Sequence, residues 1–243
     1  MPHLTITFRE FTSGVLDLVF PPSCVHCGRD GALLCGPCVR DSTAVSKDVC
    51  RLCAEPLSKP GTCTRCVIDG SSLDRLYGSF LYETPVGSAV RAFKFDDVRA
   101  LGGVLAGMFN AESMKRSEAD LILPVPMHKS RLRSRGYNQS EILGRKLSNR
   151  LGIEFFSDVL VRGQNTVPQS EQPTAVARKT AIQGAFSVDS QYEDLVVGKR
   201  VLLVDDVFTT GSTIQATATV LKAAGASWVG AAVLTVQPIG SLK

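Results

Sequence analysis

The chain has 243 residues, a formal net charge of +4 and 44% hydrophobic residues. This length accommodates one domain of ordinary size and a small module, and the modest charge gives no general electrostatic argument for nucleic-acid binding. No stretch approaches the roughly 20 apolar residues of a membrane span. The N-terminus does not resemble a secretory signal, because charged residues interrupt its apolar run. We therefore expect a cytoplasmic globular protein without a membrane span.

Apolar residues at three- and four-residue steps predict an amphipathic helix over residues 4–20, which Pro21 and Pro22 would end. Packing of this helix against the rest of the protein is favoured over a role at a membrane surface. The acidic residues Glu10 and Asp17 on the helix disfavour binding to anionic lipid.

All eight cysteines lie between residues 24 and 66, in four C-x-x-C pairs. Disulfides are not expected in a reducing compartment, and the spacing suits two structural Zn²⁺ ions, each held by four thiolates with no position left open. So short a segment, with few large apolar residues, would need metal to fold. The simplest pairing is sequential, although spacing alone leaves an interleaved pairing open. The predicted zinc ligands are Cys24, Cys27, Cys35, Cys38, Cys50, Cys53, Cys63 and Cys66.

His26 lies inside the first pair and is expected to be a turn residue, because four thiolates already complete a zinc shell. Residues 69–72 are the expected linker. Residues 1–70 are therefore predicted to form an N-terminal helix and a double zinc-ribbon module, and residues 71–243 a larger domain.

Strands and helices alternate in the pattern of the larger domain. Expected strands cover residues 76–82, 121–123, 159–161, 185–188, 201–204 and 229–236. Expected helices cover residues 86–93, 98–116, 138–151 and 214–224. The alternation from residue 121 onward predicts an α/β fold with a doubly wound parallel sheet.

A basic segment follows the strand at 121–123, with Lys129, Arg131, Arg133 and Arg135 within seven residues. A solvated surface is the plain interpretation. Its position after a sheet strand instead favours a loop that contacts a polyanion, such as pyrophosphate or the backbone of a single-stranded nucleic acid. Tyr137 is the best stacking residue nearby, so the sequence gives DNA binding only modest support.

The polar segment over residues 162–183 is longer than most connections between sheet elements and is typical of a lid. Its long polar side chains are those of Arg162, Gln169, Arg178 and Lys179.

The most informative stretch runs from the apolar strand at 201–204 through Asp205 and Asp206 into a turn rich in hydroxyl groups. The turn consists of Thr209, Thr210, Gly211, Ser212 and Thr213. The start of the following helix would offer free N–H groups to a phosphate, and glycine allows a close backbone approach. Ionised carboxylates accept hydrogen bonds from hydroxyls, so a ribose 5-phosphate fits better than an ordinary strand, turn and helix cap.

This stretch resembles the phosphoribosyl pyrophosphate (PRPP) motif of type I phosphoribosyltransferases. The wider chain is similar to the ComF family, which includes competence protein ComFC and GntX-like proteins of bacteria. The motifs that carry this resemblance, in order, are the cysteine pairs, Pro124-Val125-Pro126, Arg135-Gly136-Tyr137-Asn138-Gln139, Arg162 with Gln169, Arg178, Ala185-Phe186 and residues 201–213. In one departure, Ala181 stands where the family usually has Asn.

The resemblance implies a type I phosphoribosyltransferase fold, binding of PRPP with Mg²⁺, and a link to natural transformation. It implies that Asp205 and Asp206 hold the ribose hydroxyls and that residues 209–213 hold the 5-phosphate. Arg135 and the segment 162–179 would cover the pyrophosphate.

Two functions follow. In the first, the protein is an enzyme that transfers ribose 5-phosphate from PRPP to an acceptor, with Asp205 and Asp206 as catalytic residues and Asp206 as a candidate acid or base. In the second, the protein senses PRPP without turnover and binds single-stranded DNA or competence proteins through the basic segment and the zinc module.

Overall fold

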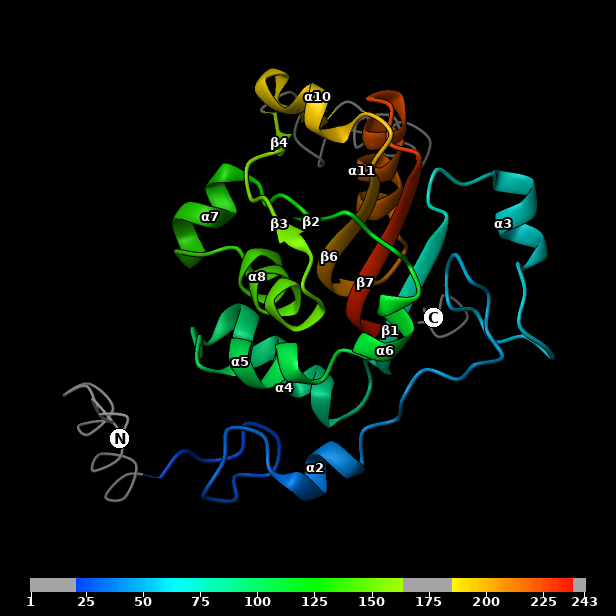
Figure 1. Cartoon of the computed structure of the whole chain (residues 1–243). Helices are drawn as coiled ribbons and strands as arrows, with labels where there is room; N and C mark the ends of the chain where they lie inside the picture. Colours follow the sequence, from blue (N-terminus) through cyan, green and yellow to red (C-terminus); the bar gives the residue numbers. More distant parts are fainter. Residues whose placement is uncertain (1–20, 164–184, 238–243) are drawn as a thin grey trace, which may run out of the picture.

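The computed structural model describes residues 21–163 and 185–237 (Figure 1). The helix expected over residues 4–20 and most of the predicted lid lie outside these ranges. The centre of the fold is a five-stranded sheet in the order β1-β7-β6-β2-β3, in which all neighbours are parallel. Its strands are β1 (Arg75–Leu81), β2 (Leu121–Pro124), β3 (Glu154–Phe155), β6 (Arg200–Phe208) and β7 (Trp228–Val236).

Helices cover both faces of this sheet, as Figure 1 shows. One face carries α4 (Pro85–Phe95), α5 (Leu101–Gly107), α6 (Ala111–Lys115) and α8 (Gln139–Leu151). The other carries α10 (Glu193–Val196), preceded by the short η2 (Ser190–Tyr192), and α11 (Ser212–Ala223). These layers confirm the predicted doubly wound parallel sheet.

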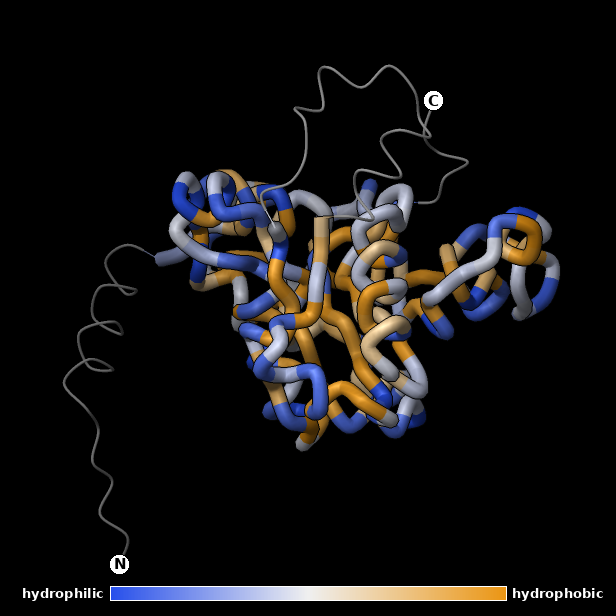
Figure 2. The backbone as a smooth tube through the Cα atoms, turned by 90° about the horizontal axis from the view of Figure 1, so that it is seen from above, coloured by the Kyte–Doolittle hydropathy of each residue, from blue (hydrophilic) through white to orange (hydrophobic). Residues whose placement is uncertain are grey.

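The apolar run of β6 explains this layering, because a strand covered on both faces needs hydrophobic side chains in both directions. Leu202 joins the core that contains α8, whereas Leu203 joins the core that contains α11. Figure 2 shows the resulting hydrophobic segments in the middle of the molecule, where the strands lie.

Two expected elements differ from the structure between residues 98 and 135. The helix expected over 98–116 is two helices, α5 and α6, because Asn110 interrupts it and caps α6 by accepting a hydrogen bond from Ser113 N at 3.3 Å. The basic segment is a helix, α7 (Lys129–Arg135), and not a loop. His128 caps its start, and Gly136 ends it with a φ of 79°.

The strands expected at 159–161 and 185–188 were wrongly placed in the main sheet. They form β4 (Leu160–Arg162) and β5 (Phe186–Val188), an antiparallel pair with its own two-stranded sheet. Both strands are short, and Val161 and Ser187 at their centres are exposed, so neither could fill a position covered on both faces. The pair packs on α11, where Phe186 contacts the core residue Ala216.

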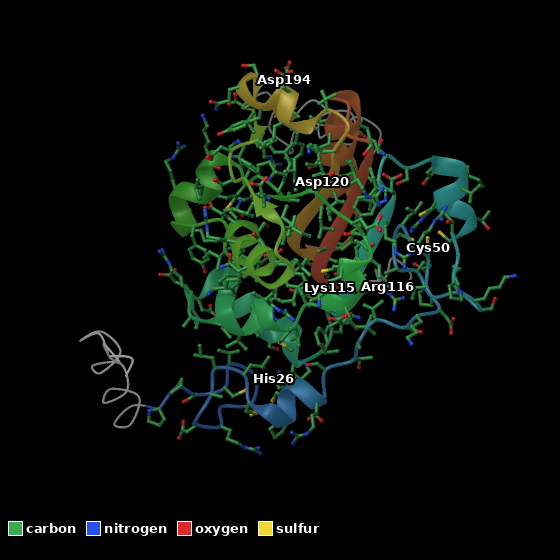
Figure 3. All side chains as sticks on the ribbon, viewed as in Figure 1. His26, Cys50, Lys115, Arg116, Asp120 and Asp194 are labelled. Carbon is green, nitrogen blue, oxygen red and sulfur yellow. The ribbon has the colours of Figure 1, made fainter. Side chains whose placement is uncertain are left out.

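The cysteine segments extend the two cores separately. The first ribbon (residues 24–38, with α2, Gly36–Arg40) joins the core of α4, and His26 Nδ1 lies 3.0 Å from Ser88 Oγ of that helix. The second ribbon (residues 50–66, with the start of α3, Thr64–Asp69) joins the core of α11. Figure 3 labels His26 in the first ribbon and Cys50 in the second. The division at residue 70 into two domains stays a prediction.

None of the helices within residues 21–163 and 185–237 is long and apolar enough to cross a membrane.

Candidate functional site

A cavity of about 1080 Å³ lies at the carboxyl ends of β2 and β6. These two strands are neighbours, but α8 after β2 covers one face of the sheet and α11 after β6 covers the other. Such a switch point is where open α/β sheets bind ligands. Val125, Pro126 and Met127 after β2 form one wall, and residues 205–207 of β6 form part of another.

Asp205 and Asp206, the acidic pair, lie on the wall that β6 forms. The expected strand at 201–204 continues to Phe208, so Asp205 and Asp206 lie within β6 rather than after it. Ser140 Oγ of α8 donates to Asp205 Oδ1 at 2.8 Å, and the N–H of Asp206 donates to the same oxygen at 2.9 Å. Asp206, only 5% exposed, forms an ion pair with Lys94, whose Nζ lies 2.8 Å from Oδ1.

The two carboxyl groups have different environments. Burial and the adjacent charge of Asp206 raise the pKa of the Asp205 carboxyl to about 7, although Lys94 and the donors on Ser140 and Asp206 oppose this rise. Asp205 therefore changes its charge near neutral pH, where a group can both accept and donate a proton efficiently. Asp206 has Lys94 as a direct counter-ion instead.

The turn between β6 and α11 requires glycine. Gly211 has a φ of 75°, and a Cβ at this position would lie 2.5 Å from the ring of Phe208. Gly211, the N-cap residue of α11, has no side chain to cap the helix, and Ser212 N donates to Thr210 Oγ1 at 3.4 Å. The other backbone N–H groups of the first turn are available to a ligand.

The structure does not direct all five turn residues into one cavity. Thr209 and Thr213 line the main cavity. Thr210, Gly211 and Ser212 line a second cavity of about 540 Å³, between the second ribbon and α11. Thr210 Oγ1 and Ser212 Oγ lie 2.9 Å apart there.

Helix α7 divides its cations between two sides. Arg131 and Arg135, one turn apart, line the cavity, whereas Lys129 and Arg133 do not. The Arg135 guanidinium lies 5.2 Å from the centre of the Phe95 ring and donates to Gln139 Oε1 at 2.8 Å.

Arg162 of β4 also lines the cavity, with its guanidinium 5.1 Å from the centre of the Phe186 ring. Burial, and to a lesser degree the charge of Arg131, lower the pKa of Arg162. The other predicted lid residues, Gln169, Arg178 and Lys179, lie outside the described ranges.

Several cavity residues were not assigned from the sequence. Lys94 and Phe95 end α4, Ser140 lies in the first turn of α8, and Tyr82 follows β1. Only the fold brings the end of α4 to the acidic pair. The one local signal was the sequence Phe93-Lys94-Phe95, a cation between two aromatic residues at the end of a helix.

The eight cysteines form two groups in sequential order, Cys24, Cys27, Cys35 and Cys38, and then Cys50, Cys53, Cys63 and Cys66. Within each group all sulfur atoms lie within 4.8 Å of one another. Sulfur pairs such as Cys27–Cys35 and Cys53–Cys63 are 3.6 and 3.7 Å apart, close to the ~3.8 Å edge of a tetrahedron with Zn–S bonds of about 2.3 Å.

Backbone N–H groups support the thiolates. Cys35 N donates to Cys24 Sγ at 3.5 Å, and Cys63 N donates to Cys50 Sγ at 3.3 Å. The two clusters therefore fit structural zinc with sequential pairing, and His26 belongs to neither.

Two parts of the chain match known domain families. Residues 138–243 match the phosphoribosyl transferase domain family, and residues 15–67 match the double zinc ribbon domain family. The chain is 30% identical over 223 residues to the DNA utilization protein YhgH of Salmonella typhimurium, covering 87% of this chain and 96% of the relative. It is 29% identical over 217 residues to competence protein F of Haemophilus influenzae, covering 83% and 91%. The chain belongs to the ComF family.

Among solved structures, a purine phosphoribosyltransferase from Pyrococcus horikoshii aligns with this ComF-family chain at a TM-score of 0.38 and 22% identity. The alignment covers 57% of this chain and 75% of that protein. A score this low supports no conclusion about ligand or reaction.

Proposed function

We propose that the cavity binds PRPP with Mg²⁺ and that the protein transfers ribose 5-phosphate from it to an acceptor. The observation that carries the proposal is the acidic pair beside the uncapped start of α11, at one switch point of the sheet. Asp205 and Asp206 would accept hydrogen bonds from the ribose hydroxyls. The 5-phosphate would lie at the start of α11, with Thr209 and Thr213 on the cavity side.

The cations that line the cavity suit the pyrophosphate group. Arg131 and Arg135 of α7, together with Arg162, line the cavity. A guanidinium group can donate two parallel hydrogen bonds to two oxygens of one phosphate group. Three residues of the expected lid, Gln169, Arg178 and Lys179, are proposed as further pyrophosphate ligands from the sequence alone.

Mg²⁺ prefers carboxylate and phosphate oxygens, and Asp205 and Asp206 are carboxylates on the cavity wall that suit it. When bound, Mg²⁺ would neutralise charge that develops on the departing pyrophosphate.

The transfer breaks the bond from ribose C1 to the pyrophosphate oxygen and forms a bond from C1 to the acceptor. Pyrophosphate leaves with the electron pair, and the acceptor loses a proton. A carboxyl with a pKa of about 7 can take that proton at neutral pH, so Asp205 is a better candidate for the base than Asp206, whose carboxyl group contacts Lys94 directly.

The names of the relatives suggest the cellular setting. DNA utilization protein YhgH and competence protein F are named for DNA use and competence, so we propose that this protein acts in the cytoplasm in the handling of incoming DNA. A non-catalytic role remains the second candidate, in which the protein senses PRPP and binds single-stranded DNA or competence proteins. Lys129 and Arg133 favour it, because they are exposed on α7 and do not line the cavity.

Release of pyrophosphate from PRPP in the presence of Mg²⁺ tests the enzyme proposal. Release should be lost in Asp205→Ala and Asp206→Ala and unchanged in Asp194→Ala, an exposed residue of α10 labelled in Figure 3. PRPP binding without release, together with salt-dependent DNA affinity that falls in Lys129→Ala/Arg133→Ala, would favour the second role. Absence of both PRPP binding and release would contradict both candidates.

A further inference from the structure

Gln139 has a buried hydrogen-bond donor without a partner. It is the first residue of α8, is 1% exposed, and lines the main cavity. Its Nε2 forms no hydrogen bond within the described part of the chain. Leaving a buried donor unsatisfied costs about 1–3 kcal/mol, and such groups are rare in native proteins. The free amide is therefore available to a partner that binds in the cavity.

The orientation of this amide is determined by its neighbour. Arg135 Nη1 donates to Gln139 Oε1 at 2.8 Å. A guanidinium has donors and no acceptor, so the amide atom that faces Arg135 must be the oxygen. The remaining atom is then Nε2, which can only donate. The Phe95 ring, 5.2 Å from the Arg135 guanidinium, helps to hold this arrangement.

The groups around Gln139 also lack acceptors. Arg162 has a buried Nε without a hydrogen-bond partner among the described residues. No ion pair within that part of the chain involves Arg131, Arg135 or Arg162, although all three line the cavity.

Helix α8, of 13 residues, begins at this wall and adds the partial positive charge of its N-terminus. Its cap, Asn138, accepts a hydrogen bond from Ser140 N at 3.1 Å and donates to Val125 O at 3.1 Å, which fixes the start of the helix against the end of β2. A ligand that satisfies this wall must bring several acceptor oxygens and negative charge.

We propose that Gln139 is a ligand-binding residue that donates Nε2 to an oxygen of a diphosphate group, while its Oε1 positions Arg135. This assignment rests on the proposed function, in which the diphosphate is the pyrophosphate of PRPP. The start of α11 then takes the 5-phosphate, and the start of α8 takes the other end of the ligand.

Titration calorimetry of the full-length, zinc-loaded protein with inorganic pyrophosphate, PRPP and ribose 5-phosphate, each with Mg²⁺, tests this role. Gln139→Glu keeps an acceptor for Arg135 but replaces the donor by a negative oxygen. We expect affinity for pyrophosphate and PRPP to fall on the order of 10- to 100-fold, the factor expected for a hydrogen bond to a charged group. Affinity for ribose 5-phosphate should stay within about twofold. Gln191→Glu, an equal charge change at an exposed position of η2, should leave all three affinities unchanged.

Two outcomes would overturn the role of Gln139 without contradicting the proposed function. Gln139→Glu could bind pyrophosphate and PRPP as tightly as the wild type, which would show that Gln139 only holds Arg135. It could also lose ribose 5-phosphate equally, which would show a structural role. A wild-type protein that binds pyrophosphate but not PRPP would contradict the proposed function. The role of Gln139 would then still be supported if Gln139→Glu weakened the binding of pyrophosphate. If Gln139→Glu does not fold, Gln139→Met keeps the side-chain length and predicts the same selective loss.

Discussion

Replacing Asp205 by Asn separates the charge of this carboxyl from its contacts. An Asn side chain keeps an oxygen that can accept from Ser140 Oγ and from the N–H of Asp206, the two donors at 2.8 and 2.9 Å. Only the charge is removed. The pKa of Asp205 is raised from 3.8 to about 7, so the carboxyl in the folded protein resists an ionisation that the unfolded chain undergoes near pH 4. The ionisation of Asp205 therefore lowers the free energy of unfolding of the wild type as pH rises from about 4 to about 7, and it has no further effect above that.

The magnitude follows from the same pKa. Each pH unit by which a pKa rises corresponds to about 1.4 kcal/mol, so Asp205→Asn should be more stable than the wild type by at most about 4 kcal/mol at pH 8. About 2 kcal/mol of this difference should appear between pH 5.5 and pH 8. Urea unfolding of the zinc-loaded, ligand-free proteins at these two pH values measures it.

Asp194→Asn is the matched control, because Asp194 is exposed on α10, and its stability should follow the wild type within about 0.5 kcal/mol at both pH values. An Asp205→Asn protein that is less stable than the wild type at pH 8, or a difference that does not change with pH, would refute this account of the acidic pair.

Three further changes test the surroundings of the cavity. Gly211→Ala should lower the free energy of unfolding by about 2 kcal/mol or more, because of its φ of 75° and an aromatic ring 2.5 Å from the added Cβ. Gly107→Ala, in helix α5 with open space around it, should leave the free energy of unfolding unchanged or raise it by up to about 1 kcal/mol in the same urea melts. Cys53→Ser should reduce bound zinc from two ions to one per chain by elemental analysis, and two retained ions would contradict the role of Cys53 as a required zinc ligand. Lys94→Met should cost about 2 kcal/mol at pH 8, since it leaves the nearly buried Asp206 without its cation, and an unchanged melt would argue against this ion pair.

Local sequence patterns predicted the parts of the fold that depend on neighbours in the chain. The apolar run at 201–204 predicted β6, and the C-x-x-C spacing predicted the two cysteine clusters with sequential pairing as the simplest choice. Gly211 was predicted as a close-approach residue before α11, and it has a left-handed φ there.

The elements that differed depend on tertiary packing or lack a local signal. Helix α7 has no apolar stripe, and its four cations favoured the prediction of a loop. His128 at its start and Gly136 at its end mark the helix in the structure. The strands β4 and β5 have the composition of sheet strands, and only their exposed centres show that they lie outside the main sheet. Lys94 meets Asp206 because α4 packs across the sheet, a contact that no spacing in the sequence encodes.

We propose that the cavity at the carboxyl ends of β2 and β6 is a PRPP site. Its most direct measurement is the dissociation constant of PRPP, with Mg²⁺, from the zinc-loaded full-length protein. We expect saturable binding of one PRPP per chain. Binding should be weakened about tenfold or more in Asp206→Asn, the loss expected for a charge-assisted hydrogen bond, and unchanged in Asp194→Asn. Absence of saturable binding, or equal affinity in wild type and Asp206→Asn, would contradict it.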